Sequence, residues 1–300
     1  MTFTQIRRAV LEPRHATLAG IGMMVTGIFL FSVNDVMGKW LVATYPVAQV
    51  LLVRSLAALI MLAPFIRREG VAAFRGAPRP GLQILRVVFS TLEVACFYWA
   101  VTSLPLADVM TYYLAGPIYV TALSALFLGE KVGWRRWAAV TAGFAGVLVA
   151  LQPSPATLTL PALVSLAGSL FFALLMITTR KLSGTSDTVL VTGQTVAALL
   201  LGLVMAPFAW VAPGGRDLAL LSLLGIVAMV AHVCVNRALK LAPASVVVPY
   251  QYMLIVWAVV FGYLVFGDVP QASTLVGAAI IVGAGLFIFL REQSLARPQG

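Results

Sequence analysis

The sequence is built almost entirely from apolar runs that are each about as long as a membrane-spanning helix. Crossing a hydrocarbon core roughly 30 Å thick takes about 20 apolar residues in a helix, and ten such runs follow one another between short linkers. They occupy 18–40, 46–64, 82–102, 105–128, 134–151, 157–179, 188–211, 217–236, 242–265 and 272–290. With 61% hydrophobic and 10% charged residues, the chain lacks the polar surface of a soluble domain. We therefore expect an all-α integral membrane protein, since the alternating pattern of a membrane β-barrel is absent.

The second half of the sequence repeats the first half at a constant offset of 138 residues. Both copies contain an Ala followed five residues later by Pro, then an apolar run with a Tyr, then Gly and an acidic residue. The aligned pairs are Ala100 with Ala238, Pro105 with Pro243, Tyr112 with Tyr250, Tyr119 with Trp257, Gly129 with Gly267 and Glu130 with Asp268. Internal symmetry of this kind in an apolar chain is typical of transporters that hold their substrate between two halves.

The charges of the loops indicate that the second copy is inverted in the membrane. Each half has five spans, and an odd number of crossings leaves the second copy upside down. Loop 129–136 is basic, whereas its copy 267–273 contains no Lys or Arg, and basic loops stay on the cytoplasmic side. Only Arg216 in an outer loop and Lys39 at an outer helix end depart from this rule. We predict ten transmembrane helices in two inverted five-helix repeats, with both termini cytoplasmic.

The predicted organisation has four parts: a cytoplasmic tail at 1–17, a first five-helix repeat at 18–151, a second repeat at 157–290 and a cytoplasmic tail at 291–300. The first span is expected to remain in the mature protein, because its apolar part is too long for a signal peptide. The net charge of +10 does not indicate nucleic acid as a partner, since the basic residues are divided among the loops.

The two cysteines are expected to be packing residues. Cys96 and Cys234 are themselves an aligned pair of the repeat, and both fall inside apolar spans. A single pair is sparse for a metal site or a disulfide framework, whereas small polarizable side chains pack readily between helices. We predict no metal and no cofactor.

These features resemble the drug/metabolite transporter (DMT) superfamily of EamA type. The resemblance is carried by the two inverted sets of five spans, the Gly129-Glu130 turn with its Gly267-Asp268 copy, and a Pro opening the fourth and ninth spans. It covers about 18–290. It implies export or exchange of small metabolites, often amino acids, across a bacterial inner membrane through a central cavity formed mainly by spans 1, 3, 4, 6, 8 and 9. Aromatic amino-acid exporters of the YddG type are the relatives it suggests.

Two prolines interrupt equivalent spans. Pro117 cannot donate to the carbonyl of Tyr113, and Pro249 likewise frees the carbonyl of Ser245. Freed backbone groups are tolerated in a membrane where they line a cavity or find new partners. We expect the polar-tipped side chains beside them to line a substrate cavity, namely Tyr112, Tyr113, Tyr250 and Gln251. The alternative is a kinked helix packed by aromatic rings.

Charged groups inside the spans are the second set of candidates, because an ionisable side chain in lipid costs on the order of 3 kcal/mol. Glu93 is either a functional residue or the partner of Arg86 or Arg54. Asp35 and Lys39 lie four residues apart, a spacing that favours a structural ion pair. His232 is either a packing residue or a proton-coupling group. The remaining polar and aromatic candidates for the cavity are Asn34, Tyr98, Trp99 and Asn236.

The function predicted from these observations is secondary transport of amino acids, neutral and aromatic ones included, and similar small metabolites by alternating access. The alternatives are transport of another small metabolite or drug, and a passive channel or lipid-handling protein. An enzyme is not indicated, since the sequence has no P-loop, Gly-x-Ser-x-Gly or zinc-type His pair. The expected partners are a small-molecule substrate and the bilayer, and the sequence is compatible with a monomer.

Overall fold

The structure is a computed structural model that describes residues 13–103, 106–152, 159–266 and 272–295. The regular structure in these ranges is helical. The elements are α2 (Pro13–Val42), α3 (Val47–Arg75), α4 (Pro80–Ser103), α5 (Leu106–Tyr113), α6 (Gly116–Leu128), α7 (Trp134–Leu151), α8 (Leu160–Lys181), α9 (Asp187–Met205), η2 (Ala206–Phe208), α10 (Gly215–Leu241), α11 (Ala244–Val247), η3 (Val248–Tyr252), α12 (Met253–Phe261), η4 (Gly262–Phe266) and α13 (Ala272–Leu295). The Pro105 and Gly267-Asp268 motifs, and part of each predicted tail, lie outside the described residues.

The helices confirm an all-helical membrane protein. Within the described ranges, six helices are long and apolar enough to cross a membrane, and shorter apolar helices lie at Gly116–Leu128, Ala244–Trp257 and Leu275–Ala284. Large apolar side chains such as Ile60, Leu126 and Leu264 point outward over the helix surfaces, which is the pattern expected where lipid rather than water is the surroundings.

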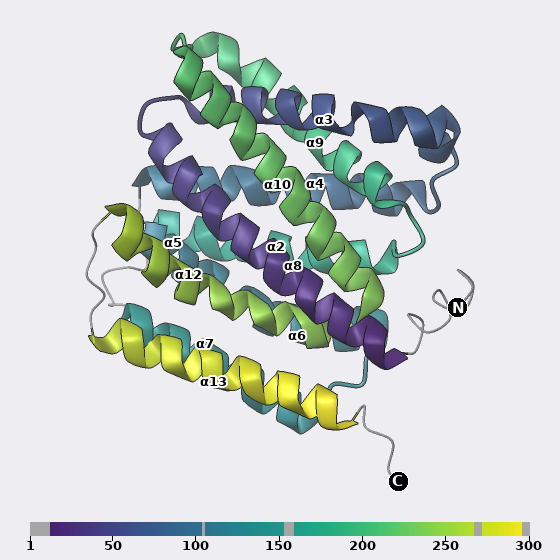
Figure 1. Ribbon diagram of the computed structural model, residues 1–300, viewed down its shortest axis with the longest axis vertical. Coiled ribbons are helices and arrows are strands. Elements are labelled where there is room, and N and C mark those ends of the chain that lie inside the picture. The colour runs from purple at the N-terminus through teal and green to yellow at the C-terminus, as the bar shows by residue number, and fades with distance from the viewer. Residues whose placement is uncertain (1–12, 104–105, 153–158, 267–271, 296–300) are drawn as a thin grey trace, which may run out of the picture.

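The helices pack in pairs that follow the duplication. α2 packs against α10, and α4 packs against α8. In the predicted repeat, α2 and α8 open the two halves, and α4 and α10 are the third long helix of each half. The two pairs are therefore the ones that this repeat would make equivalent. α3 packs against α9 and α7 against α13, so that these pairs form opposite edges of the molecule (Figure 1). The main apolar core lies between the edges, where α2, α6, α8, α10 and η3 meet.

Both proline-bearing segments are broken helices. α5 ends at Tyr113 and α6 begins at Gly116, with Pro117 in its first turn. The Tyr113 carbonyl accepts a hydrogen bond from the Ser169 hydroxyl of α8 at 3.0 Å, so a partner from the other half replaces the missing backbone donor. In the second half, α11 ends at Val247 and the chain continues as the 3₁₀ segment η3 with Pro249 in its first turn.

One end of the helices is rich in polar contacts, and we call it the polar end. α3, α6, α8 and α10 end there, and α4, α7, α9 and α11 begin there. The contacts that join these termini involve Glu69, Gln83, Glu130, Arg136, Arg180, Thr185, Ser186, Asp187, Arg237, Lys240 and Ser245. At the opposite end, the Tyr45 hydroxyl donates to Asp217 at 2.6 Å.

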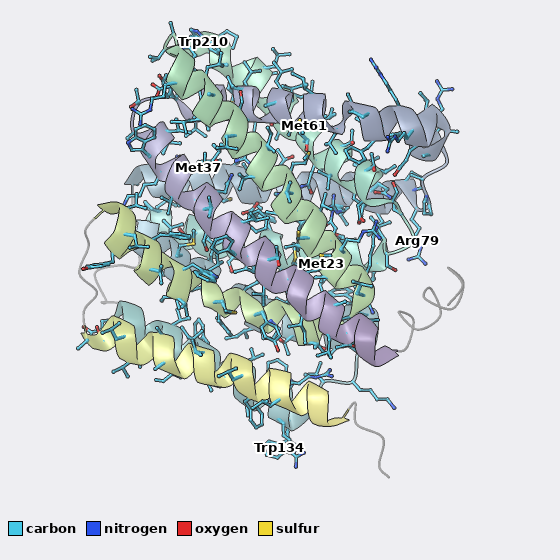
Figure 2. The ribbon with its side chains drawn as sticks, viewed as in Figure 1. Met23, Met37, Met61, Arg79, Trp134 and Trp210 are labelled. Atoms are coloured by element: carbon cyan, nitrogen blue, oxygen red, sulfur yellow. The ribbon has the colours of Figure 1, made fainter. Side chains whose placement is uncertain are left out.

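Tryptophans mark both ends of the helices. Figure 2 shows Trp210 and Arg79 at opposite ends, and Trp134 at the start of α7. Trp134, at the polar end, is 73% exposed. At the other end the Arg216 guanidinium lies 5.5 Å from the ring centre of Trp40. Exposed tryptophans beside basic side chains are typical of the two membrane interfaces, which agrees with helices that cross a bilayer.

Candidate substrate cavity

A cavity lies at the centre of the molecule between the two halves. The space open to the centre of a water molecule is about 100 Å³, which is room for several waters. Its walls come from α2, α3, α4 and α5 of the first half and from α8, α10, η3 and α12 of the second half. The lining residues are Ile28, Phe31, Asn34, Asp35, Arg54, Glu93, Val94, Phe97, Tyr98, Met110, Tyr113, Leu114, Phe172, His232, Gln251 and Leu254.

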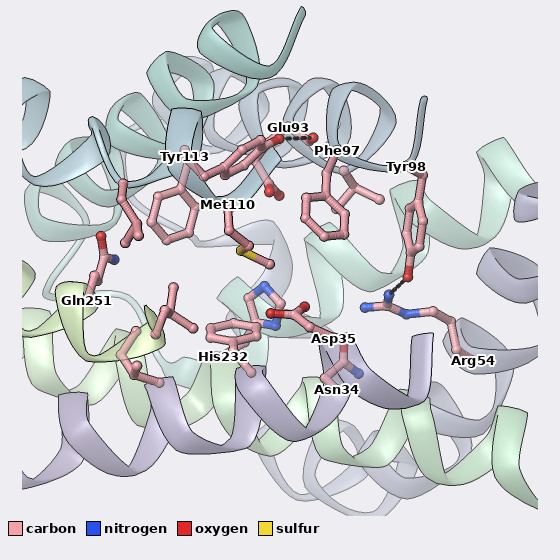
Figure 3. A pocket seen from close by; sticks show the side chains of 16 residues that line it. Asn34, Asp35, Arg54, Glu93, Phe97, Tyr98, Met110, Tyr113, His232 and Gln251 are labelled. Carbon is pink, nitrogen blue, oxygen red and sulfur yellow. Dashed lines mark hydrogen bonds between the residues drawn. The ribbon is translucent and has the colours of Figure 1, made fainter. Parts of the chain in front are cut away.

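Three charged side chains from three different helices meet in this cavity (Figure 3). The Arg54 guanidinium donates to the Tyr98 hydroxyl at 2.7 Å. It also lies close enough to Asp35 and Glu93 to interact with both carboxylates electrostatically. Neither carboxylate accepts a hydrogen bond from the residues that the structure describes. The cavity therefore contains two carboxylates and one guanidinium whose hydrogen-bonding capacity is mostly unused.

Two glycines on second-half helices allow first-half groups to approach the cavity. A Cβ atom at Gly225 of α10 would collide with the backbone of Arg54, and one at Gly168 of α8 would collide with the hydroxyl of Tyr113. Tyr113 is held by a hydrogen bond from its hydroxyl to the backbone carbonyl of Glu93 at 3.0 Å. The positions of Arg54 and Tyr113 thus depend on the absence of a side chain on the opposing helix.

Two further polar side chains of the cavity are satisfied by backbone carbonyls of α10. The Asn34 amide donates to the carbonyl of Leu224 at 2.9 Å. The His232 Nδ1 lies 2.7 Å from the carbonyl of Ala228; because a carbonyl only accepts, Nδ1 carries the proton. The imidazole packs edge-on against Phe31, with ring centres 4.9 Å apart.

A smaller cavity of about 40 Å³ adjoins the central one and shares Arg54, Val94 and His232 with it. It lies between α3, α4, α9 and α10, and its other polar walls are Ser55, Ser90, Gln194 and Thr195. Gln194 in turn accepts a hydrogen bond from Arg86 at 2.9 Å. A polar region therefore extends from the central cavity towards the polar end.

Arg86 does not pair with Glu93, although the two side chains lie on nearly the same face of α4. Its guanidinium is 1% exposed and donates only to neutral acceptors on α8, α9 and α10. These are Thr179 Oγ1 at 2.8 Å, the Leu190 carbonyl at 2.9 Å, Gln194 Oε1 at 2.9 Å and Asn236 Oδ1 at 3.3 Å. Arg86 thus ties three helices to α4, and Glu93 remains without that partner.

The other predicted site residues lie outside the cavity lining. Lys39 is exposed near the end of α2, and the contacts of Asp35 do not include an ion pair with it. Trp99 is 45% exposed on the outer side of α4. Tyr250 is buried in the main apolar core, Asn236 is a partner of Arg86, and Tyr112 is partly buried on α5. A substrate contact of these residues stays a prediction.

Several lining residues were not predicted. Phe97, Met110 and Phe172 are apolar, and nothing in their sequence surroundings separates them from ordinary core residues. The polar wall of the smaller cavity could have been found, because Gln194 interrupts an otherwise apolar run in the way that marks a functional or interhelical contact.

At the polar end, Glu130 joins the end of α6 to the start of α11. Its carboxylate accepts hydrogen bonds from the backbone N–H groups of Ala244 and Ser245 at 2.9 and 3.0 Å, and from the Ser245 hydroxyl at 2.6 Å. Arg136 also donates to Ser245, and Arg180 Nε lies 4.0 Å from Glu130 Oε1. The acidic residue of the first repeat motif therefore holds the start of the broken helix in the second half.

The described residues contain no group of three or more His, Cys, Asp or Glu side chains arranged to hold a metal ion. The side chains on the cavity wall offer charge pairing, hydrogen bonding and apolar contact. Such a set of groups can bind a small polar molecule with an apolar part.

Comparison with known proteins gives the family. The EamA-like transporter family matches residues 18–152 and 159–290. A riboflavin transporter from Rhizobium johnstonii is 30% identical over 96% of this chain and 96% of its own length. An S-adenosylmethionine uptake transporter from Rickettsia felis is 28% identical over 92% and 94%, and a pseudopaline exporter from Pseudomonas aeruginosa is 30% identical over 89% and 94%.

A solved crystal structure has the same fold. It superposes with a TM-score of 0.77 over 94% of this chain and 99% of its own length, at 18% sequence identity. One family model matches the chain twice, and the relatives align over nearly the whole chain. The chain therefore belongs to the EamA-like transporter family of the DMT superfamily, whose members are small-molecule transporters of the membrane.

Proposed function

We propose that the protein is a secondary transporter that exports or exchanges amino acids and similar small metabolites across the bacterial inner membrane by alternating access. The observation that carries this proposal is the central cavity with Asp35, Arg54 and Glu93 on its wall. An amino acid has an ammonium and a carboxylate group on an apolar or polar side chain. The cavity offers carboxylates for the ammonium group and guanidinium and amide donors for the carboxylate group. Its aromatic and aliphatic surface can contact the substrate side chain.

The proposal includes the predicted topology: ten spans in two inverted sets of five, at 18–151 and 157–290, with both termini in the cytoplasm. The equivalence of the α2–α10 and α4–α8 pairs supports it. The basic side chains at the polar end support a cytoplasmic location for that end. In this topology the Glu130 contacts close the cytoplasmic side of the cavity, and alternating access requires them to separate.

The relatives are named for different substrates, which favours a common fold whose substrate-binding side chains differ from one family member to another. One relative is named for riboflavin, another for S-adenosylmethionine and a third for pseudopaline. One of these is named an uptake transporter and another an exporter, so the same fold serves both directions. We assign the choice of substrate in this chain to the residues of the cavity wall.

A counterflow screen tests the function. Purified protein is reconstituted in vesicles loaded with each of the twenty amino acids, and exchange against external labelled amino acid is measured. We expect several amino acids to exchange, with apparent affinities within roughly tenfold to a hundredfold of one another, since apolar contacts discriminate by only about 1 to 3 kcal/mol per methylene. Exchange of no amino acid, or of a single one only, would contradict this proposal.

Cysteine labelling tests the topology. Cys96 and Cys234 are first replaced by Ala, and single cysteines are then placed in the 129–136 and 267–273 loops. A membrane-impermeant maleimide should reach the second loop from outside the cell and the first loop only in inverted vesicles. Labelling of both loops from the same side would show that the second repeat is not inverted.

A further inference from the structure

We propose that the central cavity selects cationic metabolites, whose positive group is held between the carboxylates of Asp35 and Glu93. This inference rests on the proposed transport function and adds the charge of the preferred substrate to it. A zwitterion with an extra cationic group, such as a basic amino acid, fits the site better than a neutral or acidic one.

The charge count of the cavity is the first argument. Its ionisable side chains are Asp35, Arg54, Glu93 and His232. The imidazole of His232 is held by one backbone carbonyl and packed against Phe31, surroundings that suit its neutral form. Two carboxyl groups then face one guanidinium, so the acidic groups of the cavity outnumber its basic groups.

The environment of the two carboxylates is the second argument. Neither accepts a hydrogen bond from the described residues, and Arg54 directs its one described hydrogen bond to Tyr98. The surrounding wall is mostly apolar, with Phe97, Met110 and Leu254 among its members. An uncompensated carboxylate in such surroundings is unfavourable. A cationic substrate group supplies the missing counter-charge, and a neutral substrate does not.

An unused donor at the far end of the cavity is an independent observation. Gln251 is 2% exposed and lines the cavity, yet its amide nitrogen has no hydrogen-bond partner among the described residues. Buried polar groups without a partner are rare and call for an explanation. Figure 3 shows Gln251 and Arg54 at opposite ends, with Asp35 and Glu93 between them. Gln251 is therefore placed to donate to an acceptor, such as a carboxylate, on a substrate whose cation lies between the two acids.

The proposal is tested with a matched pair of probes, L-arginine and L-citrulline, which have the same length and differ in a guanidinium against an uncharged ureido group. Both are measured by counterflow into vesicles that contain the full chain. We expect arginine to be exchanged with an apparent affinity at least about tenfold better than citrulline, the size of one charge-assisted contact. Equal affinities would overturn the proposal.

Substitutions of Asp35 and Glu93 test whether these two carboxylates cause the preference for arginine over citrulline. Asp35→Asn and Glu93→Gln should each lower the affinity for arginine by about tenfold more than the affinity for citrulline, so that the ratio of the two affinities falls. The melting temperature of each purified variant shows whether it is folded. Glu69→Gln removes a carboxylate that is hydrogen-bonded to Ser186 at the polar end, and it should leave the ratio of the two affinities unaltered. A ratio that stays at the wild-type value in both cavity variants would overturn the assignment.

A binding measurement separates this inference from the transport function. Melting temperatures of the purified protein are recorded with arginine, citrulline and agmatine, the decarboxylated analogue of arginine. Arginine and agmatine should stabilise the protein more than citrulline. Gln251→Met should weaken the effect of arginine but not that of agmatine, because agmatine has no carboxylate for that amide. Selective stabilisation without any counterflow would remove the transport proposal and keep the cation site. Equal stabilisation by all three compounds would remove the cation site.

Discussion

The region towards the polar end and the central cavity contain the same kinds of charged side chain. They differ in how many hydrogen-bond partners those side chains have. Towards the polar end, Arg86 donates to four acceptors, and at that end Glu130 accepts three hydrogen bonds. In the cavity, Arg54 makes one described hydrogen bond, and the carboxylate of Glu93 accepts none from the described residues. A saturated charge fixes the helices that surround it, whereas an unsaturated one is available to a ligand.

This difference separates two roles that look identical in the sequence. Arg54 and Arg86 are both single basic residues within apolar runs. What distinguishes them is the number of partners that other helices provide. We therefore expect substitutions at the polar end to change stability and substitutions in the cavity to change transport.

The largest effect is expected for Arg86→Leu. The substitution removes the donors of four buried acceptors on three helices, and breaking a buried charged network of this kind costs about 3 to 5 kcal/mol. Such a loss is a large part of the stability of a folded protein, so the yield of folded protein and its melting temperature in detergent should both fall strongly. Arg86→Lys keeps the charge without the planar fork and should lie between the wild type and Arg86→Leu. A wild-type melting temperature for Arg86→Leu would show that the polar end is not a structural network.

The next effect concerns the approach of α10 to α3. Gly225→Ala should displace the backbone of Arg54, and overpacking of this kind costs about 1 to 3 kcal/mol. Both the melting temperature and the exchange of substrate should decrease, because the guanidinium moves within the cavity. Gly22→Ala is the matched control, since Gly22 lies within α2 with no atom close to its missing Cβ. An equal response of the two variants would mean that Arg54 does not depend on this close approach.

The same substitution in both regions gives the sharpest comparison. Glu130→Gln keeps one side-chain acceptor oxygen but loses the charge that caps α11, and it should lower stability by about 1 to 2 kcal/mol. Glu93→Gln removes a charge without hydrogen bonds from apolar surroundings and should leave the melting temperature unchanged or raise it, while it alters substrate exchange. Measuring melting temperature and counterflow for both variants tests this reversal. A stability loss in Glu93→Gln as large as in Glu130→Gln would abolish the distinction between the two regions.

Much of the helical fold could be predicted from the sequence, because the positions of helices and of their breaks depend on local features. The length of the apolar runs predicts membrane helices, and a proline within a run predicts a break, as at Pro117 and Pro249, although α3 continues through Pro64. The position of the cavity between the halves follows from the duplication.

The partners of individual side chains could not be predicted in the same way. The four acceptors of Arg86 lie 93 to 150 residues away on three helices, and no local pattern relates them. Tyr98 and Trp99 are neighbours in the sequence, yet the first lines the cavity and the second lies on the outer side of α4. Successive residues of a helix point about 100° apart, so only the packing of α4 against α8 decides which of them faces the substrate.

The smallest effect is expected for Tyr98→Phe. The substitution removes the acceptor of the one described hydrogen bond of Arg54 and leaves the ring in place, a change worth about 1 kcal/mol. Because the freed guanidinium can turn towards Asp35 or Glu93, it should neutralise part of the surplus charge and lower the affinity for a cationic substrate by roughly fivefold, without change in melting temperature. Tyr45→Phe removes a comparable hydroxyl, which donates to Asp217 at the end of the molecule opposite the polar end. This control should leave substrate affinity at the wild-type value. If Tyr98→Phe instead raises the affinity for cations, then Tyr98 does not hold Arg54 away from the carboxylates, and Arg54 competes with the substrate in the wild-type protein.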